Sequence, residues 1–435
     1  MWSDPPFEPK KTSQILDPIH GFIDLTPEMK EVIDTVWYQR LRDIKQMGTS
    51  YLVFPSAIHT RFEHCLGTAH LARKFASHLR KTQADLEITE RDVQNVAMAG
   101  LIHDLGHGPH SHMFDRFVVP KLHSSPWSHE DASVMLFNHI ADNSGLDLER
   151  EDVRRIEDMV QGVRGGPKPF LGEIVANKVN SIDVDKFDYL NRDKHFLGEK
   201  GFNSQYDYIR RCSRVIGDSI CFERKTAYSL YGLLQERFGL FQRVYTHRVS
   251  HALDLMHADA LLLANNHYHF ETVIHDPEAY TGLTDFIFSE IQHSSLPELR
   301  SSQDILKRVK FRRLYKLAGE VHVPEGSVEH WNHLSASEII TSRTTSLRAE
   351  DVEVCTINLS WAKDSISRDL LFYRAGVDEK VEVPLESISA VMPQHTSDCI
   401  VRVFVKDAAK LEETQAAFKA FLQRDAPNCI DTFPS

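Results

Sequence analysis

The chain has 435 residues, of which 42% are hydrophobic and 26% are charged, and its formal net charge is −12. This length predicts several domains or one large domain with an appendage, and the acidic balance argues against a generally basic nucleic-acid-binding protein. No run approaches the roughly 18 apolar residues that a membrane span needs, and the N-terminus lacks the apolar segment of a signal peptide. The six cysteines form no CxxC pair. We therefore expect an intracellular protein, cytoplasmic or nuclear, without membrane association.

Residues 1–14 contain three prolines and are predicted to form a disordered tail. Apolar residues spaced three and four apart then predict a series of helices. They are expected at 27–46, 61–79, 88–101, 128–140, 181–195, 206–215, 228–265 (as one or two helices), 278–292 and 303–316. The short alternating segment 214–225, with Gly217 and Asp218 near its start, predicts a β-hairpin.

After about Gly326 the pattern changes to short β-type segments. Strands are predicted at 354–361, 370–373, 381–383 and 400–405, followed by an amphipathic helix at 407–423. The fold class is therefore mainly α. We expect a helical core over residues 15–325 and a smaller C-terminal α+β lobe over 326–435, which we assign to oligomer assembly.

Histidines cluster in the first third of the chain, and segment 103–112 reads His-Asp-Leu-Gly-His-Gly-Pro-His-Ser-His. Neighbouring side chains on a regular helix diverge by about 100°. His103 and Asp104 can therefore face one ion only where the helix ends. The glycines and the proline that follow them predict such an ending.

Two further candidate metal ligands lie outside this segment, His64 on the preceding helix and Asp185 on a later one. A single histidine is more often an ordinary surface or core residue. The ordered set of His64, His103, Asp104 and Asp185 is much more specific. Two imidazoles and two carboxylates suit iron, manganese, zinc or magnesium, which would activate a water molecule for hydrolysis.

This ordered set resembles the HD-domain superfamily of phosphohydrolases. Other segments are similar to its deoxynucleoside triphosphate triphosphohydrolase branch, in particular to the catalytic core of members that carry a sterile-alpha-motif. The similar segments are 34–35, 39–42, 44–46, 54–55, 61–64, 66–67, 103–113, 128–130, 182–186 and 188–189. The resemblance is clear from about Asp17 to Glu320 and fainter beyond. Few residues precede Asp17, so we expect no sterile-alpha-motif here.

The resemblance implies an enzyme that cuts deoxynucleoside triphosphates (dNTPs) into deoxynucleoside and inorganic triphosphate, with a divalent metal at the HD site and additional Mg²⁺ on the triphosphate. The implied metal ligands are His64, His103, Asp104 and Asp185. The implied catalytic group comprises His112, its orienting partner Asp115, and His107 and His129 near the phosphates. The implied triphosphate clamp comprises Arg61, Lys186 and Arg237. The residues implied around the sugar and base are Gln46, Met47, Tyr189, Asp193 and Tyr245, and Tyr189 is expected to exclude a 2′-hydroxyl.

The family resemblance also implies a regulatory site for a guanine nucleotide between subunits of a dimer or tetramer. The matching or retained residues are Asp34, Gln39, Arg42, Lys225 and Arg248. Other positions depart from the family pattern: Ser13–Leu16 lacks the expected lysine and asparagine, and Tyr208 and Glu223 replace arginines. Met47 and Thr246 also replace the usual leucine and glutamine near the substrate. Because a carboxylate repels a triphosphate, we expect nucleotide activation to be weak or absent.

Two alternatives remain open from the sequence. One is another HD-domain phosphohydrolase, a nucleoside monophosphatase or a cyclic-nucleotide phosphodiesterase, although three candidate phosphate-binding cations exceed what one phosphate needs. The other is a single-stranded nucleic-acid-binding protein that keeps the fold but not the catalysis, which the intact metal set and the acidic net charge disfavour. Weak binding of single-stranded nucleic acid is a separate expectation, as a partner of the enzyme.

Overall fold

The computed structural model describes residues 13–122, 127–199, 205–323, 328–360, 370–377, 397–426 and 430–432, with a few positions between 379 and 389. Residues 1–12 of the predicted tail lie outside the described residues. Ser13–Asp17 forms strand β1, which pairs antiparallel with β2 (Gly21–Leu25). The prediction of a tail up to residue 14 is wrong at its end, because cross-strand hydrogen bonds order Ser13 and Gln14.

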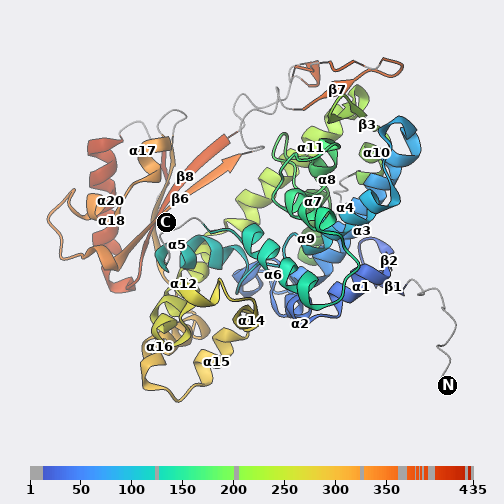
Figure 1. Cartoon of the computed structure of the whole chain (residues 1–435). Helices are drawn as coiled ribbons and strands as arrows, with labels where there is room; N and C mark the ends of the chain where they lie inside the picture. Colours follow the sequence, from blue (N-terminus) through green and yellow to red (C-terminus); the bar gives the residue numbers. More distant parts are fainter. Residues whose placement is uncertain are drawn as a thin grey trace, which may run out of the picture.

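A large helical body occupies the first three quarters of the chain, which confirms the mainly α fold class (Figure 1). Its helices are α1 (Pro27–Ile33), α2 (Val36–Gln39), α3 (Arg61–Thr82), α4 (Glu90–Ile102), α5 (Val119–Leu122), α6 (His129–Asn143), α7 (Arg150–Val160), α8 (Gly172–Val175), α9 (Val184–Leu197), α10 (Tyr206–Arg211), α11 (Ala227–Leu240), α12 (Arg248–Tyr268), α13 (Phe270–Val273), α14 (Pro277–Tyr280), α15 (Ile287–His293) and α16 (Arg300–Lys310). Helices α3 and α4 pack closely, since a Cβ on Gly100 would lie 3.1 Å from Ala69 Cα.

The predicted helix at 27–46 is wrong as a single element. It is divided into α1, α2 and a 3₁₀ turn at Arg40–Asp43. The break falls at Thr35, whose hydroxyl donates to Val32 O at 2.7 Å and accepts from Tyr38 N at 3.4 Å. A threonine side chain that bonds nearby backbone groups competes with helix continuation, although the apolar spacing persists on both sides.

Three other predicted helices are shorter than expected. The 206–215 helix ends at Arg211 and leads into β3 (Ser213–Ile216), which forms the predicted hairpin with β4 (Ser219–Glu223). The 278–292 segment is divided into α14 and α15. The 303–316 helix ends at Lys310, and β5 (Lys316–Val323) follows it. The segment 228–265 forms two helices, α11 and α12, joined by a π-helical turn at Phe241–Tyr245.

The C-terminal lobe contains an antiparallel sheet in the order β6-β8-β5-β9, formed by β6 (Val352–Ser360), β8 (Ser397–Val405), β5 and β9 (Ile430–Thr432). One face packs against α18 (Ala336–Ile340) and α20 (Leu411–Asp425), and α17 (Val328–Asn332) adds Trp331 to this core (Figure 1). The other face contacts α12 and α16 through Phe404 and Cys355. The predicted strands 354–361 and 400–405 are confirmed, except that residue 361 lies outside the described residues.

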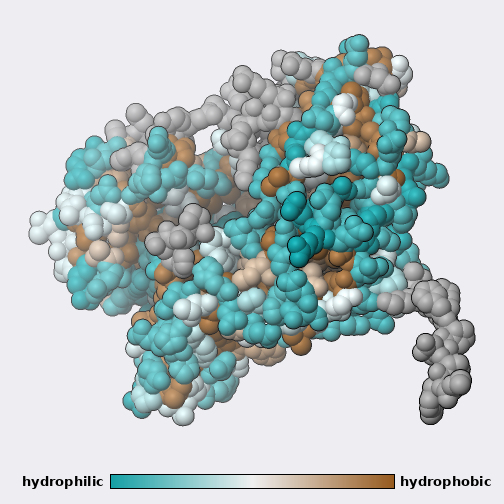
Figure 2. Space-filling view, viewed as in Figure 1, coloured by the Kyte–Doolittle hydropathy of each residue, from teal (hydrophilic) through white to brown (hydrophobic). Residues whose placement is uncertain are grey.

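The predicted strand 370–373 is present as β7 (Phe372–Tyr373), but it pairs in parallel with β4 of the helical body. Of the predicted strand 381–383, Val381 bridges Phe372, and residue 382 lies outside the described residues. Since β5 precedes residue 326 and β7 returns to the body, the division at 325/326 stays a prediction. Figure 2 shows a largely hydrophilic surface over α7. Over the residues that the structure describes, no helix is long and apolar enough to cross a membrane.

Candidate active site

The His-Asp segment leaves α4 in the turn that its glycines predict. Helix α4 ends at Ile102, and His103 is its C-cap. A Cβ on Gly106 would lie 2.2 Å from His129 O, so only glycine lets the start of α6 approach this turn. Arg40 donates to His107 O and Leu105 O and so holds the turn from the opposite side. His110 and Ser111 then adopt positive φ angles of 55°, which few non-glycine residues adopt.

The four predicted metal ligands converge from α3, α9 and the end of α4. His64 Nε2 lies 3.1 Å from Asp185 Oδ1 and 3.3 Å from Asp104 Oδ2. His103 Nε2 lies 3.6 Å and 3.5 Å from the same two oxygens. The two imidazole rings are 5.1 Å apart and tilted edge-on. Donor atoms from all four residues therefore surround one point.

The hydrogen bonds of both histidines leave the correct nitrogen available to a metal. His64 Nδ1 lies 2.8 Å from Asp188 Oδ2, and His103 Nδ1 lies 2.9 Å from Gly100 O. An acceptor at Nδ1 places the proton there and leaves the Nε2 lone pair free. Both Nε2 atoms are buried without a hydrogen-bond partner among the described residues. The donor set therefore fits a divalent cation that prefers nitrogen and oxygen ligands.

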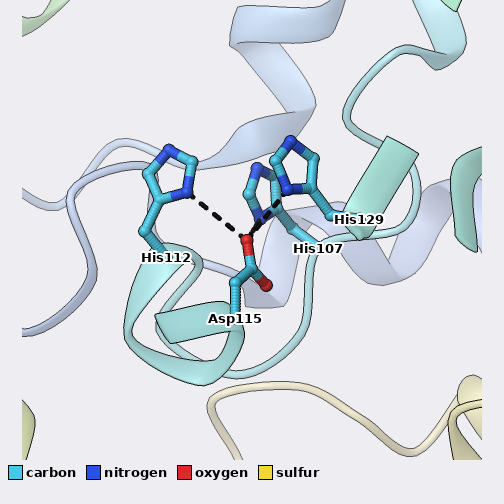
Figure 3. A group of neighbouring side chains, drawn as sticks. All are labelled: His107, His112, Asp115 and His129. Atoms are coloured by element: carbon cyan, nitrogen blue, oxygen red, sulfur yellow. Dashed lines mark ion pairs between the residues drawn. The ribbon is translucent and has the colours of Figure 1, made fainter. Parts of the chain in front are cut away.

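A second cluster of three histidines surrounds the carboxylate of Asp115 (Figure 3). Asp115 Oδ2 lies 2.9 Å from His129 Nδ1 and 3.4 Å from both His107 Nδ1 and His112 Nδ1. His107 and His129 stack with ring centroids 3.8 Å apart. His107 Nε2 lies 3.4 Å from Asp104 Oδ1, which places this cluster directly beside the metal ligands.

The electrostatics of the second cluster favour a charged imidazole at His129. Burial acts to lower the pKa of His129, but the carboxylate of Asp115, and more weakly that of Glu130, outweighs it and raises the pKa to about 9. Burial acts to raise the pKa of Asp115, but His107 and His129 hold it well below its ordinary range. His129 is therefore a cation at neutral pH. His112 is the open member of the cluster, since 51% of its side chain is exposed.

The three cations that are expected to clamp the triphosphate contact different partners in the structure. Arg61 donates to the carboxylate of Asp104 and to Ser111 Oγ at 3.0 Å, so it lies at the metal ligands. Lys186 Nζ contacts Asp183 Oδ2 at 3.0 Å. Arg237 donates to Ser360 O at the end of β6 at 2.6 Å, a contact with the C-terminal lobe that the sequence did not predict.

The residues expected around the sugar lie next to the metal ligands. The ring of Tyr189 lies 6.5 Å from that of His64 and 6.4 Å from that of Tyr245. Asp193 lies 2.5 Å from Tyr245 Oη and 2.6 Å from His59 Nε2. Gln46 and Met47 are both buried, and Gln46 O accepts from Arg61 Nη2 at 3.3 Å.

The expected activator residues do not form one cluster in this single chain. Asp34 is the C-cap of α1, and the neighbouring Gln39 and Arg42 share a 2.8 Å hydrogen bond. Lys225 lies after β4 and pairs with Glu223 Oε2 at 2.6 Å. Arg248 is the first residue of α12.

Sequence reasoning missed several residues that hold the site. Asp188, which orients His64, was noted only as part of a similar segment, and Arg40 and Ser111 were not singled out. A carboxylate three residues after Asp185 on one helix is the signal that could have identified Asp188. No local pattern marks Arg40, whose role depends on packing.

A helical fold in which two histidines and two aspartates meet beside three histidines around a carboxylate has the donors that a metal-dependent phosphohydrolase needs. The HD domain family model matches residues 61–193. The chain is 36% identical to a deoxynucleoside triphosphate triphosphohydrolase SAMHD1 homolog of Dictyostelium discoideum, over 97% of this chain and 83% of that protein. It is 38% identical to the Bos taurus SAMHD1 triphosphohydrolase (90% and 74% covered) and 36% identical to that of Homo sapiens (94% and 72%).

The chain therefore belongs to the SAMHD1 family of deoxynucleoside triphosphate triphosphohydrolases. This confirms the predicted family and enzyme class.

Proposed function

We propose that this chain hydrolyses dNTPs to deoxynucleoside and inorganic triphosphate, with His64, His103, Asp104 and Asp185 as metal ligands. The observation that carries the proposal is the 3.4 Å contact between Asp104 Oδ1 and His107 Nε2, which joins the metal ligands to the acid–base cluster. A divalent metal in this set lowers the pKa of a bound water and polarises a phosphoryl oxygen. Iron, manganese, zinc and magnesium all suit the ligands.

The protein's own residues account for the rest of the reaction. Arg61 and protonated His129 attract the triphosphate, which carries about four negative charges at neutral pH. Water attacks the α-phosphorus, and the bond to the 5′-oxygen breaks. His112, oriented by Asp115 and open to solvent, takes up the proton that the attacking water loses and returns it to this oxygen as the oxygen leaves. Tyr189 packs beside the sugar and disfavours a 2′-hydroxyl.

Product analysis tests this reaction. We would incubate the purified protein with each dNTP and Mg²⁺ or Mn²⁺, and resolve the products by ion-exchange chromatography. Equimolar deoxynucleoside and triphosphate are expected. Monophosphate and pyrophosphate, or single phosphate release, would contradict departure of the 5′-oxygen from the α-phosphorus and favour another HD-domain phosphohydrolase.

We further propose that the enzyme needs no guanine nucleotide activator. The retained Lys225 is paired with Glu223 at 2.6 Å, and 16% of the Glu223 side chain is exposed. The cation that could bind an activator phosphate is therefore already neutralised by a carboxylate that also repels that phosphate. Triphosphate release from dATP, dCTP or dTTP without GTP is expected to equal the rate with GTP. A rate near zero until GTP is added would refute this proposal.

We propose a homo-oligomer assembled with help from the C-terminal lobe, because the family resemblance at Asp34 and Arg42 implies a subunit boundary there. Light scattering coupled to gel filtration, with and without dNTPs, tests it. A monomer under both conditions at micromolar concentration would contradict the proposal.

A further inference from the structure

Behind the metal ligands lies a carboxylate that is saturated by four hydrogen bonds. Asp188 on α9 is fully buried. Its Oδ2 accepts from His64 Nδ1 and Arg192 Nε, both at 2.8 Å. Its Oδ1 accepts from His20 Nε2 at 2.6 Å and from Arg192 Nη2 at 2.9 Å. A carboxylate offers about four lone-pair positions, so this one has no freedom to rotate.

The turn between β1 and β2 positions the partners of Asp188. Asp17 Oδ1 accepts from the backbone N–H groups of Ile19 and His20 at 2.8 and 2.9 Å, which shapes this turn. Asp17 Oδ2 accepts from Arg192 Nη1 at 2.8 Å. Arg192 is fully buried between the two aspartates. Residues 17–20 therefore contact α9 across more than 160 positions of sequence.

Helix α3 is shaped to receive this network. A Cβ on Gly67, one turn after His64, would lie 1.9 Å from Asp188 Oδ1 and 2.5 Å from Arg192 Nη2. Gly67 has no positive φ that would otherwise require glycine. The missing side chain lets Asp188 and Arg192 lie directly against the helix that carries His64.

We propose that Asp188, Arg192 and the Asp17–His20 turn form the outer layer of the metal centre, and that His20 is a positioning residue for the metal ligand His64. The proposal rests on the metal site proposed above. His20 and Arg192 fix the carboxylate of Asp188, and Asp188 fixes the ring plane and the tautomer of His64. Partners of this kind control metal affinity, because a ligand that is free to rotate must be ordered when the ion binds.

A purely structural role is the competing explanation, since a buried ion pair that loses one partner destabilises a fold. His20 separates the two roles better than the fully buried residues do, because 10% of its side chain is exposed and its removal leaves the Asp188–Arg192 pair intact. His70 supplies a matched control. Its ring lies 5.5 Å from that of His20. It is partly buried on α3, and its removal leaves all four bonds to Asp188 in place.

The experiment measures Mn²⁺ affinity of the chelator-treated whole chain by calorimetry, together with the melting temperature in chelator. No nucleotide is present, so the result does not depend on which reaction the enzyme performs. His20→Ala is expected to weaken Mn²⁺ binding roughly 10-fold, the lower end of the range for such partners. His20→Gln, whose amide can donate to Asp188, is expected to recover most of this loss. His70→Ala is expected to bind Mn²⁺ as the unchanged chain does.

Three results would overturn the proposal: unchanged Mn²⁺ affinity in His20→Ala, an equal loss in His70→Ala, or no recovery in His20→Gln. Asp188→Asn provides a second measurement and is expected to weaken binding roughly 10- to 100-fold. Electron paramagnetic resonance of bound Mn²⁺ in this variant should show an altered signal. An unaltered signal with unchanged affinity would contradict the role of Asp188. Should Asp188→Asn fail to fold, the His20 variants decide the question alone. Failure of Mn²⁺ to bind the unchanged chain would instead count against the metal site itself.

Discussion

Replacing Asp115 by asparagine should remove the charge from His129. Asp115 Oδ2 lies 2.9 Å from His129 Nδ1, and the pKa of His129 stands at about 9 against an ordinary value of 6.5. Burial opposes this increase, so the neighbouring carboxylates stabilise the imidazolium by at least about 3 kcal/mol. Without Asp115 we expect the pKa of His129 to fall to 6.5 or lower. At pH 7.5 the ring then changes from almost fully protonated to mostly neutral.

The assay is a pH titration of histidine rings by nuclear magnetic resonance in protein labelled at the ring carbon, with the His129 signal identified in His129→Gln. We expect its midpoint to fall from about 9 to 6.5 or lower in Asp115→Asn. The KM for dATP at pH 7.5 should increase about 10-fold or more, because a charge-assisted contact to phosphate is lost.

Glu130→Gln is the matched control. Its carboxylate also lies near His129 Nδ1, at 3.5 Å, but 43% of that side chain is exposed, against 13% for Asp115. Water screens the exposed charge, so the control should move the midpoint only slightly. A midpoint that stays near 9 in Asp115→Asn, or an equal fall in Glu130→Gln, would refute the reasoning. Because the folded-state pKa of His129 is raised, its stabilising effect is complete below pH 6.5 and is lost as the pH passes 9.

Three further predictions concern the metal site and stability. Asp104→Asn should lose bound metal, measured by elemental analysis, and slow triphosphate release at least about 100-fold; normal metal content with normal activity would contradict its role. Gly106→Ala should lower the free energy of unfolding by about 1–3 kcal/mol, because its Cβ would meet the α6 backbone. The control Gly232→Ala lies on α11, where a Cβ would meet nothing within 4 Å, and should raise the free energy of unfolding by about 0.5–1 kcal/mol. Denaturant titrations that give the same sign for both variants would refute this prediction. Burial raises the pKa of Asp254 to about 6, so ionisation of this carboxyl weakens the fold as the pH rises from 3.8 to 6. Asp254→Asn should therefore increase the free energy of unfolding by about 3 kcal/mol at pH 8 and leave it unchanged below pH 3.8. A difference that does not depend on pH would contradict burial of the carboxylate as the cause.

Some features of this protein follow from short stretches of sequence. The apolar spacing determines α3, α4 and α12 locally, and the capping residues Thr89 and Ser128 set where α4 and α6 begin. The glycines after Asp104 predict the end of α4, and the ordered His/Asp set predicts a metal site. These predictions succeed because each depends on interactions within a few residues.

Other features were decided only by tertiary packing. Thr35 interrupts a helix whose apolar spacing continues, and Lys316–Val323 is a strand because β8 lies beside it. Arg237 donates a hydrogen bond to Ser360 O in the C-terminal lobe. Gly67 is needed because the side chains of α9 pack directly against it, and not because it forms a turn. The sequence by itself thus determined which residues could hold a metal and move a proton. Only the packed structure decided how Asp188, His20 and Arg192 position the metal ligands. A buried charge needs a partner, and that partner comes from whichever distant helix or turn packs beside it, so the spacing of residues along the chain does not predict it.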